Sequence, residues 1–323
     1  MFKMKLSLIA AAITVLPIAF SSQANEAKSF QSFSSLGYYQ AEYENVDSET
    51  FNINSQYYFE GRKTKGPLNE FDYINTLSNI SVGYLYSSSD YVSNNQFYIG
   101  GYENRTPLSY KSSNENNLIN VRGEWVVGGF VLGGSYSYQD SEYTDTFTII
   151  EENRTHHRDS NSDSDSAYSL SLGYLISENF LIQSTYHETG ELFTFRASYD
   201  LTLNDNDYIG FSYNTDEELD FHALSTKYFK SLENGSYLTV SAAYTFDNTD
   251  SDSIDVDDYW SIGSSYYFNK NTSISASYNE NESYSLAATH FFNDNYSLSA
   301  GYASTNESNN DFKSYSLSFT AQF

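Results

Sequence analysis

The sequence predicts an all-β fold, a transmembrane antiparallel up-and-down β-barrel of 16 strands, and three observations support this class. First, apolar and polar side chains alternate strictly, most clearly in SYSLSFTAQF, Ser314 to Phe323. A period of two places successive side chains on opposite faces of a strand. Second, the apolar face is rich in aromatic residues and the polar face in Ser, Thr and Gln, which suits a wall between lipid and a water-filled lumen. Third, short and long connections alternate along the chain.

The composition narrows the classes of protein further. The 323 residues include 32 Tyr and 23 Phe, yet the mean hydropathy is -0.53. Outside the extreme N-terminus no apolar run reaches about 18 residues, so we expect no membrane-spanning helix. The chain has no Cys, which excludes disulfides and thiolate metal sites. A formal net charge of -26 argues against a nucleic-acid partner.

Residues 1–24 have the features of a secretory signal peptide. Lys3 and Lys5 precede an apolar run, and small residues follow at Ser22 and Ala24. A membrane anchor helix is the alternative, but an apolar core of about 15 residues falls in the signal-peptide range. We therefore expect cleavage after Ala24. No linker or break in composition divides the rest, so residues 25–323 are expected to form one outer-membrane barrel domain.

The alternation also predicts which side chains face lipid. In the first segment the outward residues are expected to be Phe33, Tyr39 and Tyr43. On several segments the opposite face carries Ser, Thr, Gly and Asn, which leaves room for water in a barrel of this strand number. A closed barrel has no free edge, because the last strand pairs with the first, so the chain can end within a strand.

The connections predict the topology. Short turns, such as Gly128-Gly129 and the stretch from Gly61 to Asn75, are expected at the end that holds both termini. Longer, acidic connections, such as Gln139 to Ser166, are expected at the other end. The stretch QFYIGGYEN, Gln96 to Asn104, also resembles a strand, but an odd count would misplace the N-terminus. We therefore expect Ser88 to Asn117 to be one long outer loop with extended structure inside it. A second strand hidden in residues 105–117 would give the alternative of 18 strands.

Three stretches resemble a known family. The stretch from Lys65 to Tyr84, KGPLNEFDYINTLSNISVGY, follows a strand that ends in Tyr-Phe, as in the putative-porin family of Gram-negative outer membranes. The stretches FVLGGSYSY and SLGYLISENFLI, which begin at Phe130 and Ser171, are also similar to that family. The chain departs from the family at Asn69, Phe71 and Asp72, where small apolar residues are usual. The resemblance implies a passive diffusion channel in the cell outer membrane, without catalytic residues.

Charged side chains with inward parity are candidates for a constriction. They are Glu42, Glu60, Arg122, Glu124, Arg196, Asp200 and Lys227. Opposed charges across a narrow point would orient polar solutes and set ion selectivity. In the alternative interpretation, Arg122 pairs with a wall carboxylate and only braces the barrel. The stretches 88–117 and 139–166 are long enough to fold into the lumen and narrow it.

These features predict a porin that passes small hydrophilic solutes and ions, with a cation preference from its acidic mouth. The alternatives are a barrel-based outer-membrane lipase or protease and an adhesin-like structural barrel. None of the five His lies in a recognisable nucleophile motif. We expect no catalytic residue, no metal and no cofactor. The expected partners are outer-membrane lipid, lipopolysaccharide and small solutes, with no nucleic acid; a homotrimer is an analogy from porins of this size.

Overall fold

The computed structural model describes residues 29–43, 45–99, 106–149, 154–204, 207–247, 258–305 and 312–323. The predicted signal peptide, residues 1–24, lies outside these ranges. No helix among the described residues is long and apolar enough to cross a membrane.

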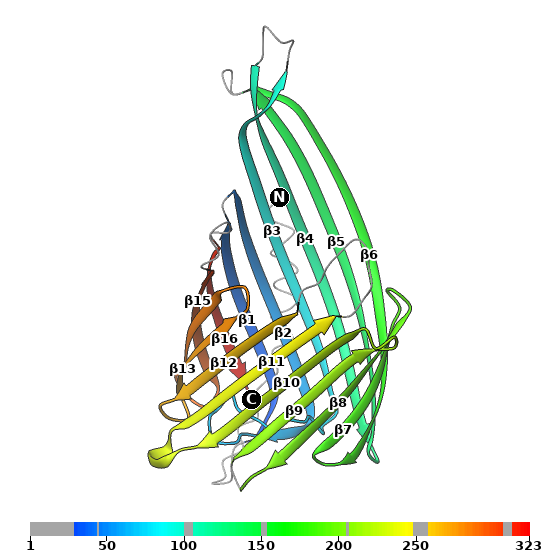
Figure 1. Ribbon diagram of the computed structural model, residues 1–323, viewed down its shortest axis with the longest axis vertical. Coiled ribbons are helices and arrows are strands. Elements are labelled where there is room, and N and C mark those ends of the chain that lie inside the picture. The colour runs from blue at the N-terminus through cyan, green and yellow to red at the C-terminus, as the bar shows by residue number, and fades with distance from the viewer. Residues whose placement is uncertain are drawn as a thin grey trace.

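Sixteen antiparallel strands close into a barrel in which each strand pairs with its neighbours in the sequence and β1 pairs with β16 (Figure 1). The strands are β1 Ser29–Tyr43, β2 Val46–Lys63, β3 Asn79–Ile99, β4 Thr106–Val127, β5 Phe130–Ile149, β6 Arg154–Ser177, β7 Phe180–His187, β8 Leu192–Thr202, β9 Tyr208–Asp216, β10 Phe221–Ser231, β11 Tyr237–Asp247, β12 Tyr259–Tyr267, β13 Thr272–Asn279, β14 Ser283–Phe291, β15 Tyr296–Thr305 and β16 Lys313–Gln322. One short 3-10 helix, η1 Glu233–Gly235, lies in a turn. The predicted fold class and the count of 16 are confirmed.

Closure explains why the chain ends within a strand. The Phe323 amide donates to the Ser32 carbonyl at 2.8 Å, and the Ser32 amide donates back to the Phe323 carbonyl at 2.8 Å. The ladder between β1 and β16 continues to the far end of both strands. The backbone groups of the last residues are therefore paired, as the absence of water in a bilayer requires.

Strand length divides the barrel into two parts. Strands β7 to β16 have 8 to 11 residues, close to the 9–11 or so that a tilted strand needs to cross a bilayer. Strands β3 to β6 have 20 to 24 residues, and Figure 1 shows them in cyan and green, rising well beyond the rest of the ring. We call this extension of β3 to β6 the projecting sheet.

The projecting sheet corrects the expected loops at this end. Residues 88–117 and 139–166 do not form loops in the lumen, because most of them continue the paired ladders of β3 with β4 and of β5 with β6. Within QFYIGGYEN, Gln96 to Ile99 belong to β3, and Phe97 pairs with Leu108 of β4. That stretch therefore adds no separate strand, and the 18-strand alternative is wrong; residues 100–104 lie outside the described ranges.

The longest connection at the end with both termini is also different from the expected short turn. Strand β2 continues to Lys63, and residues 64–78 link it to β3 without strand structure. At the opposite end, β1 and β2 are separated only by residues 44 and 45, and β13 and β14 only by residues 280–282. The prediction from loop length therefore placed the longest irregular connection at the wrong end of the barrel.

The two faces of the wall differ as the alternation predicts, except in β1. Most outward aromatic and aliphatic side chains are exposed. In β1, however, Leu36 and Tyr38 pair with the outward Ile53 and Phe51 of β2 and are exposed, whereas Phe33 lies on the lumen side against Phe71. The expected outward set of Phe33, Tyr39 and Tyr43 was therefore wrong. Apolar residues occur on both faces of β1, so parity could not be read from the sequence.

Candidate functional site

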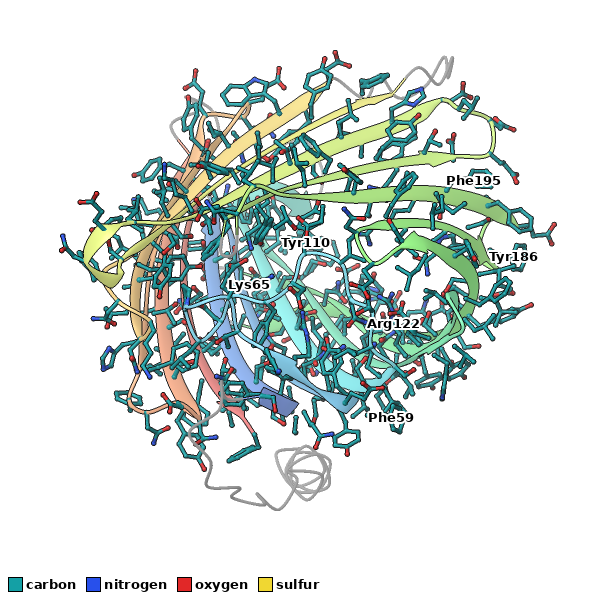
Figure 2. All side chains as sticks on the ribbon, turned by 90° about the horizontal axis from the view of Figure 1, so that it is seen from below. Phe59, Lys65, Tyr110, Arg122, Tyr186 and Phe195 are labelled. Atoms are coloured by element: carbon teal, nitrogen blue, oxygen red, sulfur yellow. The ribbon has the colours of Figure 1, made fainter. Side chains whose placement is uncertain are left out.

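A segment between β2 and β3 crosses the interior of the barrel at the end where β1 begins and β16 ends. We call residues 64–78 the crossing segment; Figure 2 views the ring from below and shows this segment passing over its interior, with Lys65 labelled on it. The Lys65 amide donates to the Glu70 carbonyl at 2.8 Å, and the Glu70 amide donates to the Pro67 carbonyl at 3.2 Å. Gly66 has a φ of +131°, which residues with a side chain rarely adopt. The Gly-Pro pair thus turns the chain after β2.

Apolar side chains join the crossing segment to the wall formed by β1 and β14. Leu68 is buried with Phe30 and Phe291, and Phe71 packs beside them. The Phe71 ring meets the Phe33 ring edge-on, with the ring centroids 5.3 Å apart. Burial of large apolar side chains contributes about 1.5–3 kcal/mol each. This contact therefore anchors one end of the segment.

Hydrogen bonds fix the same side. The Leu68 amide donates to the Lys270 carbonyl of the β12–β13 turn at 2.9 Å. The Gln322 side-chain amide donates to the Leu68 carbonyl at 3.2 Å and to the Asp294 carbonyl at 2.8 Å. Gln322 is almost fully buried, so its donors need these partners. Gln322, on the inward face of β16, therefore holds the crossing segment against the wall.

A buried carboxylate joins the crossing segment to β9 and β10. The Glu70 side chain is 3% exposed, and its Oε1 lies 2.6 Å from Lys227 Nζ. The Tyr208 hydroxyl donates to the same oxygen at 2.5 Å. Removing a carboxylate from water is costly unless charge and hydrogen bonds compensate it, and Lys227 and Tyr208 supply both. This ion pair connects positions 157 residues apart in the sequence.

Two glycines allow close packing on this same side. A Cβ at Gly66 would lie 2.5 Å from the Tyr237 ring of β11, and a Cβ at Gly210 in β9 would lie 2.4 Å from the Tyr73 ring. Real Cβ atoms do not approach other atoms this closely. The crossing segment and the wall from β9 to β11 therefore touch directly, with no space for a solute between them at these points.

On a third side the segment meets β4, β5 and β7. Ile74 is buried with Val131 and Leu181. The Asn75 side-chain amide donates to Glu124 Oε1 at 3.0 Å and to the Leu77 carbonyl at 2.9 Å. The segment thus reaches the wall at three separate places and spans the base of the lumen.

A cavity remains between the crossing segment and the part of the wall from β5 to β8. The volume of this cavity is about 550 Å³. It is lined by Lys65, Asp72, Ile74, Thr76, Gly129, Leu175, Ser177, Glu178, Asn179, Asp200 and Thr202. Lys65 Nζ lies 2.8 Å from Asp72 Oδ1. Asp200 Oδ1 is buried and has no hydrogen-bond partner among the described residues.

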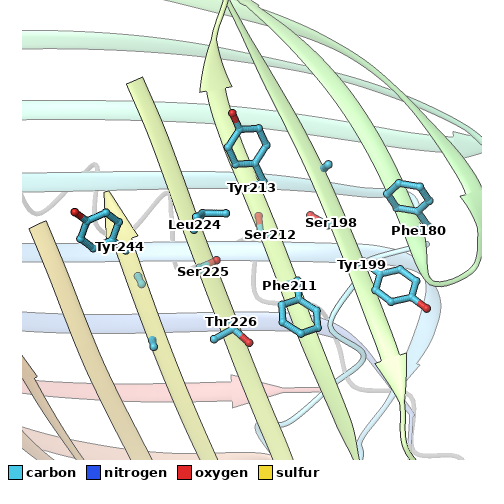
Figure 3. Close-up of a pocket in the computed structure, with 13 residues that line it drawn as sticks. Phe180, Ser198, Tyr199, Phe211, Ser212, Tyr213, Leu224, Ser225, Thr226 and Tyr244 are labelled. Atoms are coloured by element: carbon cyan, nitrogen blue, oxygen red, sulfur yellow. The ribbon is translucent and has the colours of Figure 1, made fainter. Parts of the chain in front are cut away.

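A second kind of hollow lies outside the lumen. Figure 3 shows a groove of about 470 Å³ over β7 to β11, in which rings such as Tyr199, Phe211 and Tyr213 stand beside smaller side chains. The Tyr199 and Phe211 side chains are 40% and 45% exposed. The groove therefore belongs to the apolar outer face of the barrel.

The structure brings only two of the predicted constriction residues together. Arg122 Nη2 lies 3.7 Å from Glu124 Oε2 on the inner face of β4, as in the bracing alternative. Lys227 contacts Glu70 of the crossing segment, and Arg196 Nε donates to Ser198 Oγ at 3.0 Å on its own strand. The predicted charges thus do not form one opposed ring among the described residues.

The remaining candidates lie elsewhere. Asp200 lines the cavity beside the crossing segment. Glu60 is exposed near the end of β2, on the strand face of the buried Tyr58. Glu42 is exposed and shares the strand face of Leu36 and Tyr38, so it lies on the outer side of β1.

Sequence reasoning missed Glu70, the most buried carboxylate of the site. The stretch from Gly61 to Asn75 was expected to be a turn, and the lumen was expected to be narrowed by the stretches 88–117 and 139–166 from the other end. The sequence did contain a sign of burial near Glu70. Leu68 and Phe71 lie on either side of it, and such large apolar residues are unusual in a solvated turn. Among the described residues there is no cluster of three or more His, Cys, Asp or Glu side chains that could hold a metal ion.

Comparison with known proteins gives a family for the chain. The family whose model matches residues 3–323 is described as "Putative general bacterial porin". No curated protein matches the chain.

Several solved structures are similar to the chain at low identity. The Acinetobacter baumannii outer membrane protein Omp33 has 15% identity and a TM-score of 0.46, over 92% of this chain and 100% of that chain. Pseudomonas putida OprB, in a low-pH structure, has 10% identity and a TM-score of 0.46, over 91% and 92%. The Ralstonia pickettii toluene transporter TbuX has 8% identity and a TM-score of 0.43, over 92% and 90%.

Proposed function

The chain belongs to the putative general bacterial porin family, and from this premise we propose that it is a passive, cation-preferring channel for small hydrophilic solutes and ions. The observation that carries the proposal is the inner face of the closed barrel. Many of its positions are small and polar, as in the hydrogen-bonded pairs Ser135–Ser169 and Thr289–Ser299, with oxygens 2.7 Å apart in each. A 16-stranded barrel with such walls has room for water. The proposal assigns no chemical step to the chain.

Charge supports the cation preference. The chain carries a formal net charge of -26. On β6, residues Asp159, Asp163 and Asp165 share the face of Ser169, which is the lumen side, and Asp145 of β5 shares the face of Ser135. These carboxylates belong to the projecting sheet above the mouth of the barrel (Figure 1). A negative mouth raises the local concentration of cations and lowers that of anions.

The same proposal includes the route to the membrane and the surroundings there. Residues 1–24 act as a cleaved signal peptide, and residues 25–323 insert into the outer membrane with both termini in the periplasm. The exposed aromatic and aliphatic side chains of the outer face contact lipid, and the projecting sheet reaches the layer of lipopolysaccharide. Association into a homotrimer is part of the proposal only by analogy with porins of this size.

Single-channel recording tests the proposal. The refolded full chain is placed in planar bilayers, and folding is checked by its heat-modifiable migration on gels. We expect steady ohmic openings, with a reversal potential under a salt gradient that favours cations. Reproducible silence from folded protein would contradict the channel and favour a plugged barrel, either an enzyme or an adhesin. An anion-favouring reversal potential would contradict the cation preference alone.

A further inference from the structure

The crossing segment narrows the base of the lumen unevenly. Towards β1 and β14 it is sealed by the buried cluster around Leu68, and towards β9 and β10 by the ion pair of Glu70 with Lys227. The close approach of Tyr73 to Gly210 removes the remaining space on that side. On the side of β6 and β8, beside the contact of Ile74 with Leu181 of β7, a polar cavity of about 550 Å³ adjoins the segment.

The boundary between the sealed and the open side lies between two neighbouring strands. Asp200 of β8 is directly opposite Gly210 of β9 in the register. Gly210 is covered by the Tyr73 ring, whereas Asp200 borders the cavity. The space next to the wall thus opens within one strand spacing, which is about 4.8 Å.

The walls of the cavity carry the charges that a passing ion would meet. Three carboxylates, Asp72, Glu178 and Asp200, and one ammonium group, Lys65, line it. Lys65 is paired with Asp72 at 2.8 Å, so its charge is largely neutralised there. Asp200 has an oxygen with no hydrogen-bond partner among the described residues, although its backbone is fixed by Asn179, which accepts from the Asp200 amide at 2.9 Å and donates to the Asp200 carbonyl at 3.0 Å. Asp200 and Glu178 thus leave an excess of negative charge along the cavity, which attracts cations and small cationic solutes.

We propose that solutes leave the barrel off its axis, through the cavity between the crossing segment and β6 to β8, and that Asp200 sets the cation preference of this exit. The proposal rests on the channel function proposed above and adds its route and a selectivity residue. Lys227, in contrast, belongs to the seal, because its ammonium group is held by Glu70. The solutes favoured by this exit are small inorganic cations and amines.

The route is testable by cysteine modification, because the chain has no Cys. Thr202 is exposed and lines the cavity, so T202C places a thiol in the proposed exit. Glu233 is exposed in the turn between β10 and β11, at the same end but on the sealed side, so E233C is the matched control. Each variant is recorded before and after a cationic methanethiosulfonate reagent is added, and modification is confirmed by mass spectrometry.

We expect modified T202C to lose about half of its single-channel conductance or more, since the reagent narrows the path and adds a positive charge. Modified E233C should keep its conductance. If modified T202C also conducts as before, the off-axis exit is wrong.

The role of Asp200 is tested by its charge. D200N removes the charge with little change of shape, D200E retains it, and D47N removes one charge from an exposed position in β2 near the opposite end. We expect the reversal potential of D200N to move towards that of an unselective channel, while D200E and D47N stay cation-selective. Equal reversal potentials for D200N and D47N would contradict the assigned role. Silence of the folded wild-type protein would instead overturn the channel function itself, so the two failures are distinguishable.

Discussion

The two sides of the crossing segment differ in how they meet the barrel wall. On the side of β9 to β11, Glu70 is buried against Lys227 and Tyr208, and a glycine brings the wall to the ring of Tyr73. On the side of β6 and β8, Ile74 touches the wall at Leu181, and beside this contact a polar cavity lined by Asp200 separates the segment from the wall. Both sides carry charged side chains. Among the described residues, only on the side of β9 to β11 does a charged residue of the crossing segment, Glu70, form an ion pair with a residue of the wall, Lys227.

This difference shows how one segment can narrow a barrel without filling it. A buried ion pair and close-packed rings leave no room for water, whereas carboxylates without protein partners need water or ions around them. The position of the segment therefore follows from where the wall offers compensation for Glu70. Substitutions in the segment and in the wall test this difference, beginning with the largest expected effect.

The largest effect is expected when the crossing segment is replaced. Substituting residues 66–74 by a Gly-Ser linker removes the contacts of the crossing segment with the wall on all sides. These contacts are made by Leu68, Glu70 and Ile74. We expect the single-channel conductance to rise several-fold, since the base of the lumen would then have the full width of the barrel. Recording in planar bilayers measures this. An unchanged conductance would mean that the segment does not limit the flow.

A smaller effect is expected when the sealed side alone is broken. The substitution E70A leaves the ammonium group of Lys227, which is one-third exposed, without its partner. We expect a loss of about 2 kcal/mol in the free energy of unfolding, below the 3–5 kcal/mol typical of fully buried pairs, because Lys227 can reach water. Denaturant unfolding in lipid vesicles measures this.

The double variant E70A/K227A provides the control for this pair. It removes both charges, so it should be less destabilised than the sum of the single variants. Strict additivity of E70A and K227A would show that the two side chains do not interact as the 2.6 Å contact indicates.

The smallest effect is expected from one methyl group on the wall. In G210A the new Cβ would collide with the Tyr73 ring, so the ring and the segment must shift. We expect a destabilisation of about 1 kcal/mol and a measurable change in conductance. The matched control is G134A, a glycine within β5 whose Cβ would meet its nearest neighbours at 3.4 and 3.5 Å, an ordinary contact distance. Equal stabilities of G210A and G134A would argue against the tight packing of Tyr73 on β9.

The sequence also showed where local patterns are ambiguous. In β1, Leu36 and Tyr38 face outward while Phe33 packs inward on Phe71, so apolar residues on both faces hide the parity. The alternating Ser and acidic residues before Ser169 were expected to be a loop, because loops and solvated strands have similar composition. They form a strand because β5 offers them a partner along its whole length. Of the candidate charges, Arg122 and Glu124 could be paired from their spacing of two on one strand face, since such side chains are neighbours.

The sequence by itself determined the class of fold, the number of strands and the terminal strand that closes the barrel. Period-two alternation is a local property, and the bilayer imposes it on each strand separately, so it can be read strand by strand. Only the tertiary structure decided that residues 64–78 cross the lumen, that Glu70 meets Lys227, and that Asp200 is left beside an open space. These contacts join residues far apart in the chain, and they exist only after the wall has closed and brought its inner faces around the same segment.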